Sequence, residues 1–323
     1  MMNMNRRHID TDRRGRRLKN GHRGEGPVVY WVSRDQRVED NWALLWAQQE
    51  ALIRQKGLLV VFCLVPDYLG ATSSQYSFML RGLATMQKKL HRLNIDFTLL
   101  EQSPDKILPH FLRQIDAHVV VSDFDPLRIK QRWKERLVAD VVAPFYEVDA
   151  HNIIPAWSLS RKREYAAYTI RPKIKRLLDD YLTDIPSVQT HPFDFDIKMV
   201  GDLPGVREVL GRWVSNYKGL EAGETEAQLA AKAFVGTGLK NYSALRNNPC
   251  VEGQSGLSPY LHFGQLSAQR LAWIVSQCPL PLEVKEDFLE ELIVRRELSD
   301  NYCLYEPRYD SFAGFPEWAR KSL

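Results

Sequence analysis

The hydrophobic pattern of the first half of the chain alternates between short apolar runs and amphipathic stretches. The apolar runs, which have the length and composition of strands, occupy 28–32, 58–64, 96–100, 118–123 and 144–148. Stretches with helical periodicity separate them, at 41–56, 73–93, 105–115 and 128–140. Strands this apolar, separated by helices, are buried on both faces. The pattern therefore predicts a doubly wound, parallel, five-stranded α/β sheet over residues 27–160.

The second half of the chain loses this alternation. Residues 161–182 form a basic stretch with helical periodicity, which Pro172 is expected to interrupt. Residues 183–224 are rich in Pro, Gly and Asp and have weak periodicity, which predicts an interdomain linker. From Thr225 onward the strand pattern stops and helical periodicity returns. We therefore expect an all-α domain over residues 225–323.

One predicted helix mixes charged and apolar side chains on the same faces. In the stretch FLEELIVRRELSDNY, a spacing of 100° per residue leaves only a narrow polar stripe, made by Glu290, Glu297 and Asn301. Buried charges are costly unless they are paired or hydrogen-bonded. Two interpretations are open: a bundle helix whose charges pair four residues apart, as Glu291 and Arg295 would, or a helix whose charges line a functional pocket.

The length and charge of the chain limit the classes of function that it can have. A chain of 323 residues, 44% of them hydrophobic, is long enough for two domains with sizeable cores. The formal net charge is +4, but residues 1–26 contain eight Lys/Arg against three acids, so the remainder carries −1. This arm has no apolar run, which predicts a disordered basic segment that is dispensable for the fold. It would serve as a solvated leader or as a weak, salt-sensitive contact with a polyanion.

The cysteines and the apolar runs indicate a reducing compartment and no membrane. Four scattered cysteines contain no C-x-x-C pair, so neither a zinc site nor a disulfide framework is expected, and we expect no metal. No run approaches 18 apolar residues, and the basic arm lacks the apolar core of a secretion signal. We expect a soluble cytoplasmic protein without a secretion signal, of bacterial or archaeal type and associated with the nucleoid.

Three polar loops follow predicted strands, at residues 33–41, 122–126 and 149–155. Ligands on doubly wound sheets usually bind beyond the carboxyl ends of strands, where these loops lie. The chain contains no G-x-G-x-x-G and no G-x-x-x-x-G-K-[ST], which argues against a dinucleotide fingerprint and a P-loop. Helix capping and loop hydrogen bonding is the favoured interpretation of the acids in these loops, Asp35, Asp40 and Asp123.

The stretch NYSALRNNPCVEGQSGLSPYLHFGQLS, residues 241–267, is the richest in chemistry. Ser258 before Pro259 is a typical helix start, with Ser as the N-cap. Tyr242 and Arg246, one helical turn apart, would place a hydroxyl and a positive charge on one face. Backbone amides and hydroxyls at a helix start bind anions, although an ordinary capped loop has the same composition.

Together these stretches resemble one known family. YSALRNNP, SGLSPYLHFGQLSAQR and FLEELIVRRELSDNYCLY look like the flavin domain of DNA photolyases, most closely the class II cyclobutane pyrimidine dimer photolyases. YWVSRDQRVEDNWAL, EVDAHNIIP and EYAAYTIRPK match that family's N-terminal domain in the same order. The resemblance runs from about residue 27 to residue 323. It implies a Rossmann-like α/β antenna domain followed by an all-helical flavin domain, which agrees with the fold predicted from the hydrophobic pattern.

The resemblance implies a cofactor and a reaction. Photolyases hold FAD in the helical domain, and the reduced flavin absorbs a blue or near-UV photon and passes an electron to a pyrimidine dimer that is flipped out of the duplex. An antenna chromophore, a folate or a deazaflavin, is a second candidate cofactor. The family's FAD-phosphate contacts fall on Tyr242, Ser255, Gly256, Leu257 and Ser258.

The resemblance also implies contacts with the substrate, double-stranded DNA containing pyrimidine dimers, which a monomer would bind. Glu291 matches the carboxyl that hydrogen-bonds the carbonyl oxygens of the dimer and stabilises its radical anion. Arg246 matches a DNA-binding residue, and Arg295 and Arg296 are further candidates for DNA binding. Some relatives have Trp at the position of Arg295.

The family continues beyond residue 323, so only part of the flavin domain is expected here. The remainder carries other flavin contacts and the tryptophan chain that reduces the flavin, so we expect this chain alone to bind FAD weakly. Light-driven dimer repair is the leading function. The alternatives are a cryptochrome-like flavin photoreceptor and a catalytically inactive photolyase fragment, and repair under blue light would separate them.

Overall fold

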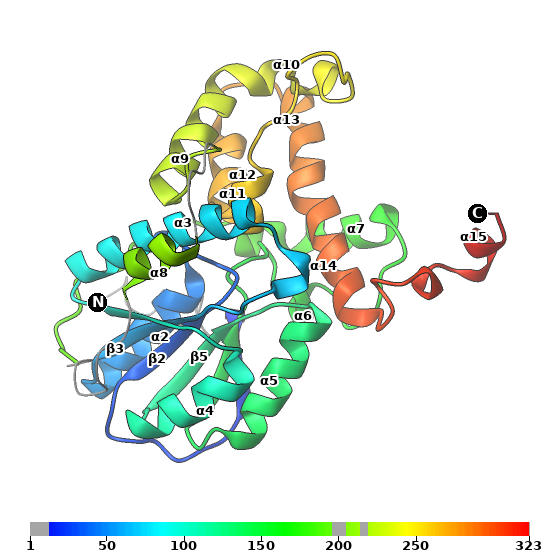
Figure 1. Ribbon diagram of the computed structural model, residues 1–323. Helices are drawn as coiled ribbons and strands as arrows, with labels where there is room; N and C mark the ends of the chain where they lie inside the picture. Colours follow the sequence, from blue (N-terminus) through cyan, green and yellow to red (C-terminus); the bar gives the residue numbers. More distant parts are fainter. Residues whose placement is uncertain (1–12, 196–204, 214–218, 323) are drawn as a thin grey trace.

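The computed structural model describes residues 13–195, 205–213 and 219–322. One sheet has the strand order β1-β6-β5-β2-β3-β4 (Figure 1). Its strands are β1 (Gly15–Lys19), β2 (Val28–Val32), β3 (Leu58–Cys63), β4 (Asp96–Leu100), β5 (Val119–Asp123) and β6 (Phe145–Val148). Strands β2 to β6 pair in parallel, and β1 pairs antiparallel with β6. The predicted doubly wound α/β fold is confirmed, with six strands in place of five.

Helices cover both faces of this sheet, as the apolar strands require. The helices are α2 (Trp42–Arg54), α3 (Ser73–Arg92), α4 (Pro104–Gln114) and α5 (Arg128–Asp140). One core packs α2 and α3 against the sheet, and a second packs α4 and α5 against the opposite face. Asn41 begins α2 because its side chain accepts hydrogen bonds from the amides of Ala43 and Leu44.

The second half of the described chain is helical, as predicted. It contains α6 (Ala156–Leu159), α7 (Ala167–Tyr181), α9 (Glu224–Ala233), α10 (Leu239–Leu245), α11 (Ser258–His262), α12 (Ala268–Gln277), α13 (Leu282–Leu289), α14 (Arg296–Tyr305) and α15 (Glu317–Ser322). Two π-helical turns, η3 (Phe234–Gly238) and η4 (Glu290–Arg295), join α9 to α10 and α13 to α14. Phe78 of α3 lies in the core of this region, so α3 packs against both halves of the chain. Pro172 lies inside α7 and does not interrupt it, contrary to the prediction.

The segment predicted as a linker, residues 183–224, packs on the α/β half instead. Ile185 and Val188 are buried in the same core as α2 and α3. Gln48 Nε2 donates to the carbonyl oxygen of Gln189, and the backbone N–H of Gln189 donates to Gln48 Oε1. Helix α8 (Val206–Trp213) lies along α3, while residues 196–204 and 214–218 are outside the described chain. Scattered apolar side chains in a Pro-rich stretch gave too weak a period to predict this packing.

The prediction of a disordered arm over residues 1–26 is wrong for residues 13–26, while residues 1–12 lie outside the described chain. Strand β1 adds to the edge of the sheet, and Arg14 before it is only 1% exposed. Its guanidinium donates to the carbonyl oxygens of Asn152 (3.1 Å) and Ile153 (2.7 Å) and to Gln269 Oε1 (2.9 Å). The guanidinium also lies over the ring of Trp42, 4.8 Å from its centroid. The buried Arg14 side chain thus anchors the arm, although the arm has no apolar run to pack against the sheet.

We predict that Arg14→Ala destabilises the protein by about 2–4 kcal/mol, because it leaves buried carbonyl oxygens without a donor. Thermal unfolding followed by circular dichroism should then show a loss of roughly 5–10 °C. Arg17→Ala is the matched control, because Arg17 lies in the same strand and is exposed. Equal melting temperatures for the two variants would contradict an anchoring role for Arg14.

Candidate functional site

A cavity of about 1020 Å³ lies where the carboxyl ends of the sheet strands meet the helical region. Its helical wall includes Tyr242, Arg246, Ser255, Ser258, Phe288, Glu291 and Arg296. Its α/β wall includes Arg34, Cys63, Tyr68, Asp125, Lys130 and His151. Most of the residues predicted from the sequence as a flavin and DNA site therefore face one shared space, which is large enough for a dinucleotide-sized ligand.

An aromatic cluster fixes Tyr242 in the cavity wall. Its ring packs edge-on against Phe288 at a centroid distance of 5.3 Å and against Phe234 at 5.7 Å. Phe234 begins the π-helical turn η3 and Phe288 lies one residue before the end of α13, so one π-helical turn and the helix that leads into the other support the tyrosine. Such turns often occur at functional sites because the additional residue re-aims the side chains that follow.

The loop from Ser255 to Ser258 contributes two side chains to the cavity and two residues to its support. Ser255 and Ser258 line the cavity. Leu257 is fully buried in the helical core, and Gly256 adopts a positive φ of 67°, which glycine accommodates without strain. The predicted N-cap at Ser258 is off by one residue. Leu257 is the cap and Ser258 begins α11, so its hydroxyl is not used for capping.

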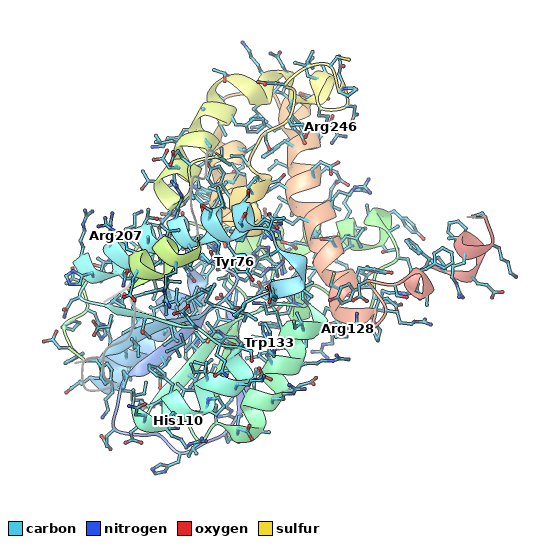
Figure 2. The ribbon with its side chains drawn as sticks, in the orientation of Figure 1. Tyr76, His110, Arg128, Trp133, Arg207 and Arg246 are labelled. Carbon is cyan, nitrogen blue, oxygen red and sulfur yellow. The ribbon has the colours of Figure 1, made fainter. Side chains whose placement is uncertain are left out.

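Arg246 and Glu291, both predicted to contact the substrate, form an ion pair with each other at the cavity wall. The distance from Arg246 Nη1 to Glu291 Oε1 is 2.8 Å. The hydrogen bond that Arg246 donates to Glu291 raises the pKa of the guanidinium, which also lies 5.8 Å from the centroid of the Tyr242 ring. Arg246 follows α10 in the upper part of the helical region in Figure 2. Of the two interpretations left open by the sequence, pairing of Glu291 with Arg295 is not the one observed, because Arg295 lies beside Glu290.

The two neighbouring arginines of η4 and α14 lie in different surroundings. Arg295 is exposed, with its Nε 3.5 Å from Glu290 Oε1. Arg296 lines the cavity, is half-buried, and donates from Nη2 to the carbonyl oxygen of His151 at 2.7 Å. Burial lowers the pKa of Arg296 from its usual value. Arg295 therefore faces solvent while Arg296 offers its charge to a ligand inside the cavity.

The α/β wall of the cavity is held to α14 by a buried ion pair that the sequence did not predict. Arg34 donates from both terminal nitrogens to Asp300, each at 2.8 Å. Burial alone would raise the pKa of Asp300, but Arg34 holds it well below its usual range. Burial lowers the pKa of His151 to about 3, and Arg296 and Arg34 reinforce the shift, so the imidazole is neutral.

The acids in the strand-end loops hold the loops in place, as the favoured interpretation stated. Asp123 accepts hydrogen bonds from the amides of Ser33, Arg34 and Asp35. Asp35 accepts from Arg37 Nη1 at 2.6 Å, and Asp40 accepts from Arg270 Nε at 2.8 Å. Burial raises the pKa of Asp123 to about 6, with the nearby Asp35 charge as the next cause. These acids position Arg34 and the loop around it.

The polar stripe predicted on the 288–302 helix is only partly exposed. Glu297 and Asn301 are 2% and 3% exposed, and both bind backbone groups, Glu297 in the 149–155 loop and Asn301 in the segment before α7. Glu297 Oε1 accepts from the amides of Ile153 (2.8 Å) and Ile154 (3.2 Å). The uniform 100° spacing failed because the π-helical turn η4 rotates everything after it.

For several cavity residues the sequence indicated the loop that carries them but not the side chain itself. Arg34 and His151 lie in the polar loops 33–41 and 149–155, which the sequence marked as ligand-facing, but nothing singled out these two side chains. Asp300 is 266 positions from Arg34, so no local pattern connects them.

Among the described residues no group of three or more His, Cys, Asp or Glu could hold a metal ion. Within the same residues no helix has the length and apolar character needed to span a bilayer.

The fold and the site define a class of protein in which an α/β sheet domain and an all-helical region share one large cavity. A family model described as DNA photolyase matches residues 28–191. The deoxyribodipyrimidine photo-lyase of Arabidopsis thaliana is 43% identical over 320 residues, which cover 92% of this chain and 63% of that protein. That of Potorous tridactylus is 41% identical and covers 91% of this chain and 57% of its own length. The chain belongs to the DNA photolyase family.

Solved structures support the same fold. A Synechocystis cryptochrome superposes with a TM-score of 0.73 at 16% identity, over 90% of this chain and 63% of that one. A class III photolyase from Agrobacterium tumefaciens gives 0.66 at 19% identity, over 89% and 60%. At these identities the structures establish the fold alone. The chain spans about three fifths of the length of the relatives and structures that it matches.

The buried Glu297 carboxyl should make stability depend on pH. Burial raises its pKa from 4.5 to about 8. The folded protein therefore holds this proton more tightly than the unfolded chain, and stability falls as pH rises from about 4.5 to about 8. We predict that Glu297→Gln, which keeps the oxygen that accepts the two amides, matches the wild type at pH 5. At pH 8.5 it should exceed the wild type by roughly 2–4 kcal/mol. Urea unfolding at both pH values measures this, and parallel pH profiles would contradict it.

Proposed function

We propose that this chain takes part in light-driven repair of cyclobutane pyrimidine dimers, with FAD bound in the cavity. The observation that carries the proposal is the meeting of Tyr242, Ser255, Ser258, Arg246 and Glu291 in one cavity wall. Identities of 43% and 41% to two deoxyribodipyrimidine photo-lyases support the same reaction. The class II subgroup is part of the proposal, because the motifs that carry the resemblance are most similar to that subgroup.

The chemistry of the cavity fits FAD. A cavity of about 1020 Å³ lies at the upper end of the range for cofactor sites. The hydroxyls of Tyr242, Ser255 and Ser258 are suited to hydrogen-bond phosphate oxygens, and the cationic Arg296 faces the same space. The edges of Tyr242 and Phe288 offer an apolar surface for flat rings. When bound, reduced FAD supplies an electron to the dimer on illumination.

Arg296 is better suited to the cofactor than to DNA. Its half-buried guanidinium is fixed by the His151 carbonyl and lines the cavity, where a DNA backbone would not reach. The side chain of the adjacent Arg295 is more than half exposed, so Arg295 remains the candidate for binding a phosphate of DNA. We therefore assign Arg296 to the diphosphate of FAD and keep Arg246 and Arg295 as DNA contacts.

Glu291 is the residue that we assign to the dimer. Its side chain is 43% exposed at the cavity wall, so a flipped base can reach it from outside. A dimer pairs and stacks poorly, so extruding it costs less than extruding normal bases, and this selects lesions without reading sequence. The carboxyl then hydrogen-bonds the dimer while Arg246, its present partner, is free to meet a phosphate.

A second chromophore belongs to the proposal as well. The part of the cavity that Tyr68 and Lys130 line, at the carboxyl ends of β3 and β5, is the place we propose for an antenna of folate or deazaflavin type. Lys130 Nζ lies 5.1 Å from the ring centroids of both Tyr68 and Trp133, a cationic and aromatic setting that suits a flat anionic ring.

We predict that Arg296→Ala weakens FAD binding about ten- to a hundredfold, because it removes charge-assisted hydrogen bonds to the diphosphate. Quenching of flavin fluorescence on titration with the protein measures the affinity. Arg295→Ala is the matched control and should change it less than about twofold, since its guanidinium faces solvent. The same loss in both variants would refute the assignment, provided that both melt like the wild type.

We predict that Glu291→Gln lowers dimer repair per absorbed photon about tenfold or more while leaving FAD affinity near the wild-type value. The assay counts dimers remaining in an oligonucleotide after blue illumination of the reduced, FAD-loaded protein. Glu290→Gln is the control, because Glu290 pairs with Arg171 of α7 and does not line the cavity. A wild-type chain that binds FAD and leaves the dimers intact would reject repair by this chain and leave a photoreceptor or an inactive photolyase fragment.

A further inference from the structure

Positive charge is concentrated in a second place besides the N-terminal arm. Residues 161–176 contain seven Lys/Arg and one acid, although the whole chain carries only +4. This segment includes the loop before α7 and the first two and a half turns of that helix. A local basic patch of this kind attracts a polyanion even when the protein as a whole is close to neutral.

The packing of α7 turns one face of this segment outward. Ala167, Ile170 and Ile174 are buried in the helical core, and α7 contacts η4 on that side. Tyr165, in the loop before α7, and Tyr168, in the first turn of the helix, are 75% and 70% exposed. Figure 1 shows α7 at the flank of the helical region, beside α14. Each of these exposed rings offers a flat apolar surface among the charges of the segment.

Three cations of the segment are already paired and hold its shape. Arg163 pairs with Glu306 and lies over the ring of Tyr165, with the guanidinium carbon 5.2 Å from the centroid. Arg171 binds Glu290 through two hydrogen bonds, and Lys173 pairs with the buried Glu164. These contacts fix the loop and the helix, so the exposed rings are presented on a stable frame.

The remaining four cations are exposed: Arg161, Lys162, Lys175 and Arg176. Within residues 13–195, 205–213 and 219–322, none of them has an acidic partner at ion-pair distance. They flank the two tyrosines, two before and two after along the segment. The surface therefore has positive charge at both ends and stacking rings in the middle.

This surface is separate from the cavity. Glu290 and Glu291 are adjacent in η4, yet Glu290 points to Arg171 of α7 while Glu291 points to Arg246 and the cavity. The π-helical turn η4 therefore lies between the Arg171 contact of α7 and the cavity. A ligand on α7 does not enter the space that we assign to FAD.

We propose that the exposed surface of α7 and of the loop before it, formed by Tyr165, Tyr168 and the four unpaired cations, binds single-stranded nucleic acid independently of the cavity. Bases stack on aromatic side chains whatever their sequence, and the flanking cations follow the phosphates. Duplex DNA would use the cations alone, because its bases are not free to stack. An acidic peptide would likewise leave the tyrosines without a role.

The test is fluorescence anisotropy of a labelled, undamaged oligothymidine of about 16 nucleotides, without added flavin. The wild type should bind it, and Tyr165→Ala/Tyr168→Ala should bind it about 10- to 30-fold more weakly. Both side chains are exposed, so this variant should melt like the wild type. A duplex of the same length should bind equally to the wild type and the tyrosine variant.

The charge variant Lys175→Gln/Arg176→Gln supplies a second measurement. The slope of log affinity against log salt concentration should decrease in magnitude by about 1.4. Lys106→Gln/Arg113→Gln is the matched control, because both residues are exposed on the distant helix α4. An unchanged affinity in the tyrosine variant, equal slopes in the two charge variants, or no binding by the wild type would overturn the proposal. Neither dimers nor flavin enter the assay, so its outcome is independent of the repair function.

Discussion

The buried polar contact between α14 and the loops that follow the sheet strands is the constraint on which the cavity depends. Arg34 and Asp300 are paired through two hydrogen bonds, and Glu297 satisfies two backbone amides of the 149–155 loop. Removing one partner of a buried pair costs about 3–5 kcal/mol because the other is left without compensation. Polar contacts of this kind tolerate little sliding, so they fix the register of the helical region on the sheet more strictly than an apolar interface would.

The π-helical turn η4 distributes the roles of one long helix over three directions. Glu290 binds α7, Glu291 lies at the cavity with Arg246, and Glu297 and Asp300 reach the α/β half after the additional residue has rotated the helix. In a regular helix Glu290 and Glu297, which are seven residues apart, would face nearly the same way. The additional residue in η4 lets them face different partners. The mixture of charged and apolar residues that is unusual for a surface helix follows from this geometry.

The sequence was sufficient where the signal was local. Apolar runs predicted the five parallel strands, and the spacing of Tyr242 and Arg246 placed both on one side of a helix. Strand β1 escaped because GRRLK has only one apolar residue, Leu18, and is held mainly by backbone pairing and by Arg14. The cavity residues of the α/β half were not predicted either, since Arg34 and His151 meet α14 only in the folded chain. The turn at η4 cannot be predicted from a uniform helical period.

The anchoring of Arg14 has a consequence for the order of events during synthesis. Its guanidinium closes on Gln269, which lies 255 residues later in the chain. At a translation rate of 5–20 residues per second, roughly 13–50 s pass between the appearance of the two residues. Until then β1 is held on β6 by backbone pairing and by the bonds from Arg14 to the carbonyl oxygens of Asn152 and Ile153, without the bond to the helical region. The first residues to emerge thus complete their contacts only after the helical region has been made.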